Sequence, residues 1–232
     1  GLNAFGAATT GVKNIAIGQL AMGTGVAIVG GGACGCDNVA LGTSALSALT
    51  QGTNNIAMGQ LSSDALTTGA DNIAIGRSSL SASTDGVKNV AIGRSALAGS
   101  GGVGDLNIAI GNLAMGVGDV SGANNIALGT NSADALTTGA CNIAMGINAL
   151  GAATIGLLNI AIGKEAMGAV TTGQADENIA IGGCALAGAA GTTGNKNIAI
   201  GINAAKGMTT GSQNISLGAS ALDATTTGAC NI

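Results

Sequence analysis

Asn14-Ile15-Ala16-Ile17-Gly18 decides the fold, because this pentad returns along nearly all of the 232 residues. Successive copies start 17 to 19 residues apart, except for one interval of 24. Self-similarity at a nearly fixed period predicts a repeat architecture whose units stack and share one core. Identical copies begin at Asn72, Asn107, Asn159, Asn178 and Asn197, and close variants begin at Asn38, Asn55, Asn89, Asn125, Asn142 and Asn214.

Each pentad predicts a short β-strand. Ile15 and Ile17 alternate with Ala16, which is the two-residue period of a strand. A helix is disfavoured, because each interior Gly would cost it about 1 kcal/mol. A second apolar anchor follows each pentad Gly, four residues on (Leu46) or seven on (Leu66), and then comes a turn rich in Thr and Gly. We expect two short strands and two turns per coil, giving an all-β parallel β-solenoid of about 13 coils.

Composition supports a thin and regular core. The chain has 43 Gly, no Pro, His, Trp or Tyr, and Phe5 as its one aromatic residue. Aromatic side chains normally fill much of a globular core, so layers of Ile, Leu, Val, Met and Ala must fill this one. We expect residues 1–232 to form a single repeat-array domain, as a fragment of a longer fibre.

Composition also excludes several classes of function. A net charge of −4 with 7 Lys and Arg provides no basic patch or stacking platform for nucleic acid. No apolar run approaches the ~20 residues of a membrane helix. The acidic residues are scattered in turns and His is absent, so we predict no enzyme activity and no catalytic, cofactor or metal site. Asp64, Asp134 and Asp223 occupy related turn positions, but we expect several coils between them.

Each residue of the pentad is expected to have a different structural role. We expect the Ile side chains to line the inside of the coil and Gly18 to adopt positive φ at a corner. The Ala column then faces outward, and we expect Ala16, Ala74, Ala109 and Ala161 to contact another chain. The Asn side chains should form a ladder whose amides bond the next backbone. This ladder comprises Asn14, Asn72, Asn107, Asn142, Asn159, Asn178 and Asn197.

The five cysteines form no C-x-x-C pair, so small buried or half-buried thiols are expected. Cys141 and Cys230 both directly precede a pentad Asn, five coils or about 24 Å apart. That separation exceeds the ~7 Å limit for a disulfide, so we expect contact only with a symmetry mate. Two segments break the period: 24–37, expected as an insertion loop and contact site, and 99–106, expected as a flexible turn rather than a calcium site.

The pentads resemble the head repeats of trimeric autotransporter adhesins of the YadA type, and similar repeats in phage and large-virus fibre proteins. The resemblance covers twelve full copies, N-(I/V)-A-(I/L/M)-G in all but the last, which has Ser216 in place of Ala. It implies a left-handed β-roll in a homotrimer on an extracellular, cell or virion surface. The 17–19 residue period and the cysteines favour a virion or phage fibre, since adhesin heads usually have shorter repeats and avoid cysteine.

Energetics independently favour assembly, since one thin roll buries little apolar surface against the cost of ordering its backbone. We therefore expect a structural fibre segment, a rigid shaft or head that supports attachment. The alternative is a binding module that contacts a cell-surface glycan, matrix or a protein receptor. The repeated Thr-Thr-Gly turns also suggest an ice-binding surface. Adjacent Thr side chains on a strand point in opposite directions, however, which disfavours a flat Thr array.

Overall fold

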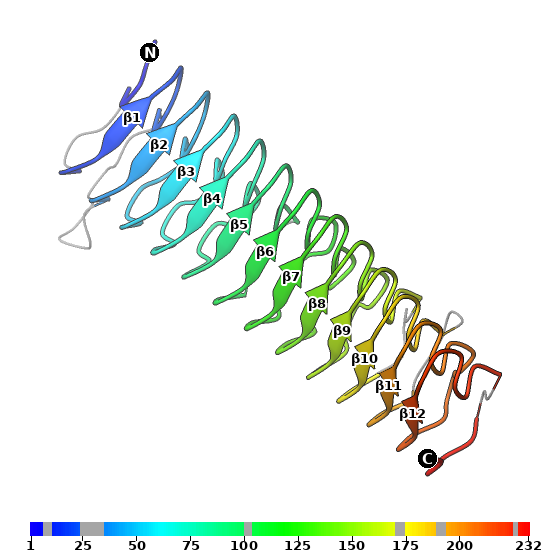
Figure 1. Ribbon diagram of the computed structural model, residues 1–232. Helices are drawn as coiled ribbons and strands as arrows, with labels where there is room; N and C mark the ends of the chain where they lie inside the picture. Colours follow the sequence, from blue (N-terminus) through cyan, green and yellow to red (C-terminus); the bar gives the residue numbers. More distant parts are fainter. Residues whose placement is uncertain (7–10, 24–34, 100–103, 170–174, 189–193, 225–226) are drawn as a thin grey trace. The chain divides into compact units, whose positions relative to one another are not determined.

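The computed structural model describes residues 1–6, 11–23, 35–99, 104–169, 175–188, 194–224 and 227–232 (Figure 1). The chain divides into two compact units, 1–119 and 120–232. Each unit holds six strands of three residues. Unit 1 contains β1 (Ile15–Ile17), β2 (Val39–Leu41), β3 (Ile56–Met58), β4 (Ile73–Ile75), β5 (Val90–Ile92) and β6 (Ile108–Ile110). Unit 2 contains β7 (Ile126–Leu128), β8 (Ile143–Met145), β9 (Ile160–Ile162), β10 (Ile179–Ile181), β11 (Ile198–Ile200) and β12 (Ile215–Leu217).

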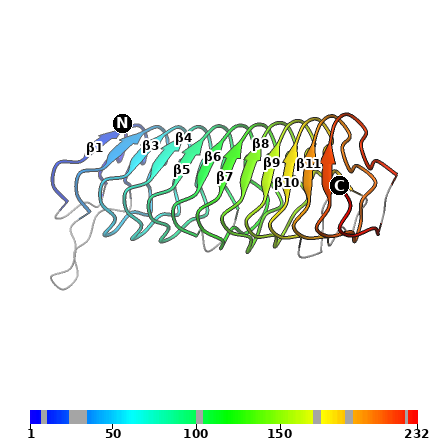
Figure 2. The same ribbon diagram turned by 60° about the horizontal axis from the view of Figure 1, so that its bottom comes forward.

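Within each unit, every strand pairs in parallel with the next strand along the chain, and equivalent pentad positions lie opposite one another (Figure 2). Ile143, for example, pairs with Ile160, which pairs with Ile179. This register confirms the predicted all-β parallel β-solenoid. The described residues contain no helix that could cross a membrane.

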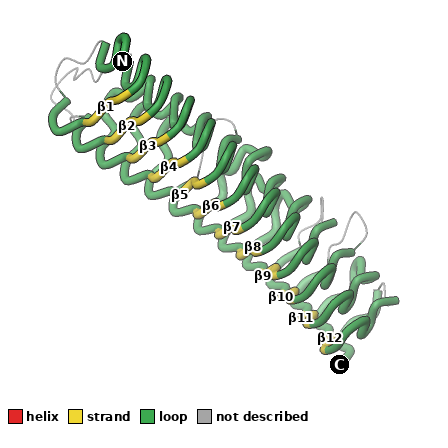
Figure 3. The backbone as a smooth tube through the Cα atoms, turned by 45° about the horizontal axis from the view of Figure 1, so that its top comes forward, coloured by secondary structure: helices red, strands yellow, loops and turns green. Residues whose placement is uncertain are grey.

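One strand per coil is found in the described residues, not the two that were predicted. Outside the strands, the described part of each coil consists of turns and loops (Figure 3). In the coil that starts at Asn142, the residues Asn148, Leu150 and Leu158 have φ of 53°, 52° and 58°. The left-handed region interrupts a strand, and the same three positions are left-handed in coil after coil. The second apolar anchor therefore enters the core from a turn.

The Ala side chains point into the coil, so the predicted direction of the pentad is wrong. Ala74, Ala109 and Ala161 are fully buried, and Ala16 in the first coil is half-buried. Ile and Met at the flanking positions face outward, with exposures of 36% at Ile75 and 37% at Met145. Where Ser216 replaces Ala it is 2% exposed, and its hydroxyl donates to the Ala221 carbonyl oxygen (2.6 Å).

The narrow interior explains this orientation. In the coil that starts at Asn142, the buried side chains include one large group, Leu150, together with Ala144, Ala149, Ala153 and the Asn. An inward Ile at each strand position would overfill this space. The predicted Leu or Met anchors are confirmed as the core at both depths. They include Leu46, Leu80, Leu97, Met115, Leu150, Met167 and Leu186 at the first depth, and Leu66, Leu136 and Met208 at the second.

The pentad Gly occupies a corner that other residues cannot adopt without strain. Gly163 has φ of 131°, and a Cβ on it would lie 2.5 Å from the Gly182 carbonyl oxygen in the next coil. The predicted positive φ is thus confirmed, and close approach between coils adds a second reason for Gly. Gly183 differs, because a Cβ added there would meet nothing within 4 Å.

This contrast gives a matched pair of substitutions. We expect Gly163→Ala to lower the free energy of unfolding by about 2 kcal/mol or more, because strained φ and backbone overlap add together. Gly183→Ala, at a position with open space, should leave it within about 0.5 kcal/mol. Thermal or urea unfolding of both variants measures the difference. Equal effects would contradict the assigned role of the corner.

Candidate functional surfaces

A ladder of buried Asn side chains runs through each unit. The Asn142 Oδ1 atom accepts a hydrogen bond from the Asn159 backbone N–H (3.0 Å) and another from Asn159 Nδ2 (3.1 Å). Asn142 Nδ2 donates to Asn125 Oδ1 (3.1 Å) and to the Gly156 carbonyl oxygen (2.7 Å). One amide therefore joins three coils and satisfies backbone groups at the turn.

The predicted Asn ladder is confirmed by this geometry. The same N–H to Oδ1 bond joins Asn72 to Asn55, Asn178 to Asn159 and Asn197 to Asn178, with donor–acceptor distances of 2.9–3.0 Å. Asn14 is half-buried at the first coil, and its Oδ1 accepts from the Asn38 backbone N–H (2.8 Å). Asn72, Asn107, Asn142, Asn159, Asn178 and Asn197 are all buried.

Each unit also carries an outward aliphatic surface, here called the strand face. It consists of the first and third residues of each strand. In unit 1 these are Ile15, Ile17, Val39, Leu41, Ile56, Met58, Ile73, Ile75, Val90, Ile92, Ile108 and Ile110. In unit 2 they are Ile126, Leu128, Ile143, Met145, Ile160, Ile162, Ile179, Ile181, Ile198, Ile200, Ile215 and Leu217. All are exposed or half-buried, so each unit presents adjoining aliphatic side chains to its surroundings.

Threonine hydroxyls bond from one coil to the next on the turn side. Thr50 Oγ1 donates to the Thr67 carbonyl oxygen (3.0 Å), and Thr67 Oγ1 donates to the Thr84 carbonyl oxygen (2.8 Å). Thr137 makes the same bond to Thr154 (2.8 Å). These hydroxyls extend the hydrogen bonding between coils, a role that suits a residue at a turn entrance.

Two aspartates at equivalent positions are partly buried. Burial raises the pKa of the Asp64 carboxyl in unit 1 and of the Asp134 carboxyl in unit 2. In unit 2, Asp134 and Asp223 lie at the same position of coils separated by five strand steps. They therefore do not form a carboxylate pair. The described residues contain no group of three or more His, Cys, Asp or Glu that could hold a metal ion.

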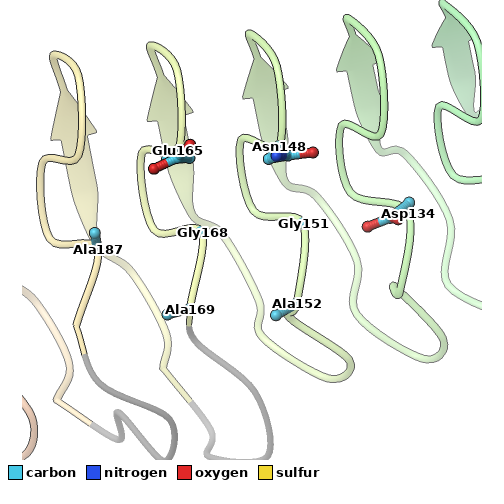
Figure 4. Close-up of a pocket in the computed structure, with 8 residues that line it drawn as sticks. All are labelled: Asp134, Asn148, Gly151, Ala152, Glu165, Gly168, Ala169 and Ala187. Atoms are coloured by element: carbon cyan, nitrogen blue, oxygen red, sulfur yellow. The ribbon is translucent and has the colours of Figure 1, made fainter.

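A groove of about 340 Å³ crosses the turns of unit 2 (Figure 4). Its lining combines three polar side chains with glycines and alanines from neighbouring turns. Sequence reasoning missed this groove, because it depends on which turn residues align between coils. The lining residues are Asp134, Asn148, Gly151, Ala152, Glu165, Gly168, Ala169 and Ala187.

Of the cysteines that the structure describes, Cys184 fits the expected buried or half-buried thiol, and Cys36, Cys141 and Cys230 do not. Cys141 and Cys230 are free and exposed, and Cys184 is free and half-buried. Cys36 is buried and disulfide-bonded. Five strand steps separate the coils of Cys141 and Cys230, which agrees with the prediction that these two do not pair within the chain.

Two predicted irregular segments fall largely outside the described residues. The insertion loop at 24–37 is described only at residues 35–37, and the Gly-rich segment at 99–106 lacks residues 100–103. In the described part of the second segment, Asp105 Oδ1 accepts a hydrogen bond from the Val87 backbone N–H (2.9 Å). This carboxylate therefore caps a turn of the preceding coil.

Comparison with known proteins adds no family name to these observations. No protein-family model, no curated protein and no solved structure matches the chain significantly.

The Asn ladder can be tested at one coil. Asn142→Leu removes the acceptor of the Asn159 N–H and the donor to the Gly156 carbonyl, leaving at least two buried polar groups unpaired. Each unpaired group costs about 1–3 kcal/mol, so we expect the free energy of unfolding to fall by roughly 2–6 kcal/mol. The control is Asn124→Leu, because Asn124 is exposed with φ of 60° and Leu158 occupies the equivalent position with φ of 58°. Denaturant unfolding curves that coincide for the two variants would contradict the ladder.

Proposed function

We propose that this chain is a structural, non-enzymatic segment of an extracellular, cell-surface or virion fibre, assembled as a homotrimer of left-handed β-rolls. The strand face carries this proposal. A monomeric protein seldom exposes adjoining Ile, Leu, Val and Met side chains over successive strands, and large apolar patches usually mark contact with a partner. A second and third copy of the chain are the occupants that we assign to this surface.

The chemistry of the strand face supports packing against other copies. Its residues are aliphatic in every strand and carry no charge, so identical faces bring together no like charges. Their exposures reach 62% at Ile17 and 64% at Leu217, which leaves apolar area for a partner to cover. The repeat gives every coil the same outward pair, so copies in register can meet coil by coil around a common axis.

The corrected pentad strengthens the link between repeat and assembly. The Ala column is already buried within each coil and has no surface left for a partner. The Ile, Val, Leu and Met column takes over the role that the sequence suggested for Ala16, Ala74, Ala109 and Ala161. Complete burial of an aliphatic side chain of this size contributes about 1.5–3 kcal/mol. Because Ile75 is 36% and Ile200 40% exposed, roughly a third of that contribution remains for a partner to supply at such a position, and each coil offers two positions.

A mechanical role fits the bonding inside each unit. The Asn ladder, the strand pairing and the Thr hydroxyls all join one coil to its neighbours. Local opening of a coil must break several of these bonds at once. We therefore propose that the trimer is a stiff support that holds an attachment surface away from a cell or virion.

A binding role is the second candidate, and the groove in unit 2 favours it. The polar groups Asp134, Asn148 and Glu165 line one recess, so the segment itself could hold a ligand as an adhesin head does. A cell-surface glycan or protein receptor is the partner class of this alternative. The ice-binding alternative lacks such support, because the first Thr of several turns already donates its hydroxyl to a neighbouring coil.

Oligomeric state tests the proposed assembly. We expect the wild-type chain to sediment as a trimer, and the double variant Met145→Asp/Ile181→Asp to dissociate. The reason is that each chain would place two carboxylates in an apolar interface, where an unpaired charge is costly. Thr138→Asp, at an exposed turn residue, is the control and should remain trimeric. A wild-type chain that is a stable monomer at all accessible concentrations would overturn the proposal.

A further inference from the structure

The groove in unit 2 is a trough made by missing side chains. Asp134, Gly151, Gly168 and Ala187 each lie five residues after a pentad Gly, so they form one column across four coils (Figure 4). Gly and Ala leave the floor open, and the Asp134 carboxylate stands at one end. All eight lining residues belong to turns, and none belongs to the strand face. The trough is therefore separate from the surface assigned to trimer assembly.

Hydrogen-bond acceptors line one rim of this trough. Asn148 and Glu165 each lie two residues after a pentad Gly, with φ of 53° and 57°. The preceding residue of this column, Asn131, has a buried Oδ1 atom with no hydrogen-bond donor. At the other side of Glu165, the Cys184 thiol donates to Glu165 Oε2 (3.6 Å). Asn131 lies outside the groove lining, so the acceptors of the rim itself are the Asn148 and Glu165 side chains.

The charge of the lining is negative. Asp134 and Glu165 contribute two carboxylates, and the described residues that line the groove include no Lys or Arg. Lys164 lies beside Glu165 with an Nζ–Oε1 distance of 3.4 Å, but both side chains are well exposed, and such pairs are weak. Lys206 follows Ala187 in the floor column, yet it is exposed and outside the lining.

Burial at Asp134 adds a reason for a cationic ligand. Partial desolvation raises the pKa of this carboxyl, and hydrogen bonds from the backbone offset the effect only in part. A positive charge placed next to a partly desolvated carboxylate stabilises its ionised form. A metal ion is a poor match, because the lining has two acidic residues and no group of three or more metal-binding side chains occurs in the described residues.

Spacing defines the shape of the ligand. Asp134 belongs to the coil of β7 and Glu165 to the coil of β9, two strand steps away, so the two residues are offset by about 10 Å along the stack at ~4.8 Å per step. They are also offset sideways, because Asp134 lies five residues and Glu165 two residues after its pentad Gly (Figure 4). The coil between them contributes Asn148 and Gly151 to the lining, and Ala152 and Gly168 lie beside this path and offer a methyl group and backbone to an aliphatic chain (Figure 4). A linear diamine with about six methylene groups spans this distance when each ammonium lies ~2.8 Å from a carboxylate oxygen.

We propose that this groove binds a linear alkyl diammonium ligand, with one ammonium at Asp134 and the other at Glu165. The Gly and Ala floor accommodates the methylene chain, and Asn148 accepts a further hydrogen bond from the ligand. Free polyamines and the amino groups of a lysine-bearing partner share this chemistry. The proposal goes beyond a structural role and does not depend on the oligomeric state.

Calorimetric titration of the full chain at low salt tests the site with three probes of similar length. We expect saturable binding of 1,6-diaminohexane, at least tenfold weaker binding of 1-aminohexane, and no binding of 1,6-hexanediol. Loss of one carboxylate in Asp134→Asn or Glu165→Gln should reduce the diamine affinity at least tenfold. The absence of saturable binding by the diamine, or equal binding of the diol, would overturn the proposal.

Two controls separate binding from folding and from general charge. Asp223→Asn changes the same column position five coils away from Asp134, so diamine affinity should be unchanged. Unfolding curves show whether each variant keeps its fold. Amide chemical shifts provide a second readout, because the diamine should shift Gly151 and Gly168 rather than strand-face residues. An equal loss of affinity in Asp223→Asn, or shifts confined to the strand face, would contradict the assignment. If peptides with paired amino groups bind as well as the diamine, the natural ligand is a protein side chain rather than a free polyamine.

Discussion

The buried Asn amide is the interaction on which the rest of each unit depends. A polar side chain inside a thin apolar coil is costly unless its donors and acceptors are paired, and in this ladder the Asn89 Nδ2 atom is buried without a partner. Asn142 meets this requirement with partners in the coils on both sides. The Asn side chain can therefore be buried only when the neighbouring coils are stacked on it. Coil length can vary around this fixed point. Asn178 keeps the same bonds to Asn159 across 19 residues that Asn159 makes to Asn142 across 17.

The fixed spacing between successive coils determines which side chains fill the interior and which face outward. The corner glycines approach each other so closely that a Cβ on Gly163 would overlap the Gly182 backbone. The coil is narrow there and admits Ala but not Ile from the strand. The bulky strand residues must face outward, where they cannot be buried by their own coil. The outward aliphatic surface is thus a consequence of a narrow coil rather than a separate feature, and the proposed trimer would cover it.

Sequence alone predicted the period, the parallel solenoid, the Asn ladder, the Gly corner and the Leu or Met anchors, because each depends on one residue type recurring at one spacing. It misplaced Ala16 and Ile17, since alternation shows that neighbours face opposite ways but does not say which way is inward. A usable signal was present: Ala is replaced once, by Ser216, whereas the outward positions hold Ile, Val, Leu or Met. Tightly packed sites tolerate the least change in volume. The second predicted strand failed because left-handed residues such as Leu150 interrupt it.

The groove illustrates how a repeat fold can form an elongated recess across neighbouring coils. Because the ladder holds successive coils about 4.8 Å apart, any side chain placed at one turn position recurs along a straight column. Removing that side chain in neighbouring coils, as Gly151 and Gly168 do, opens a trough without disturbing Leu150 or Met167 beneath the turns. In the proposed site, the charges of Asp134 and Glu165 would set the spacing between the ligand groups that are recognised. The outward strand positions and the turn positions can therefore change independently of each other, and we propose assembly as the role of the first and recognition as the role of the second.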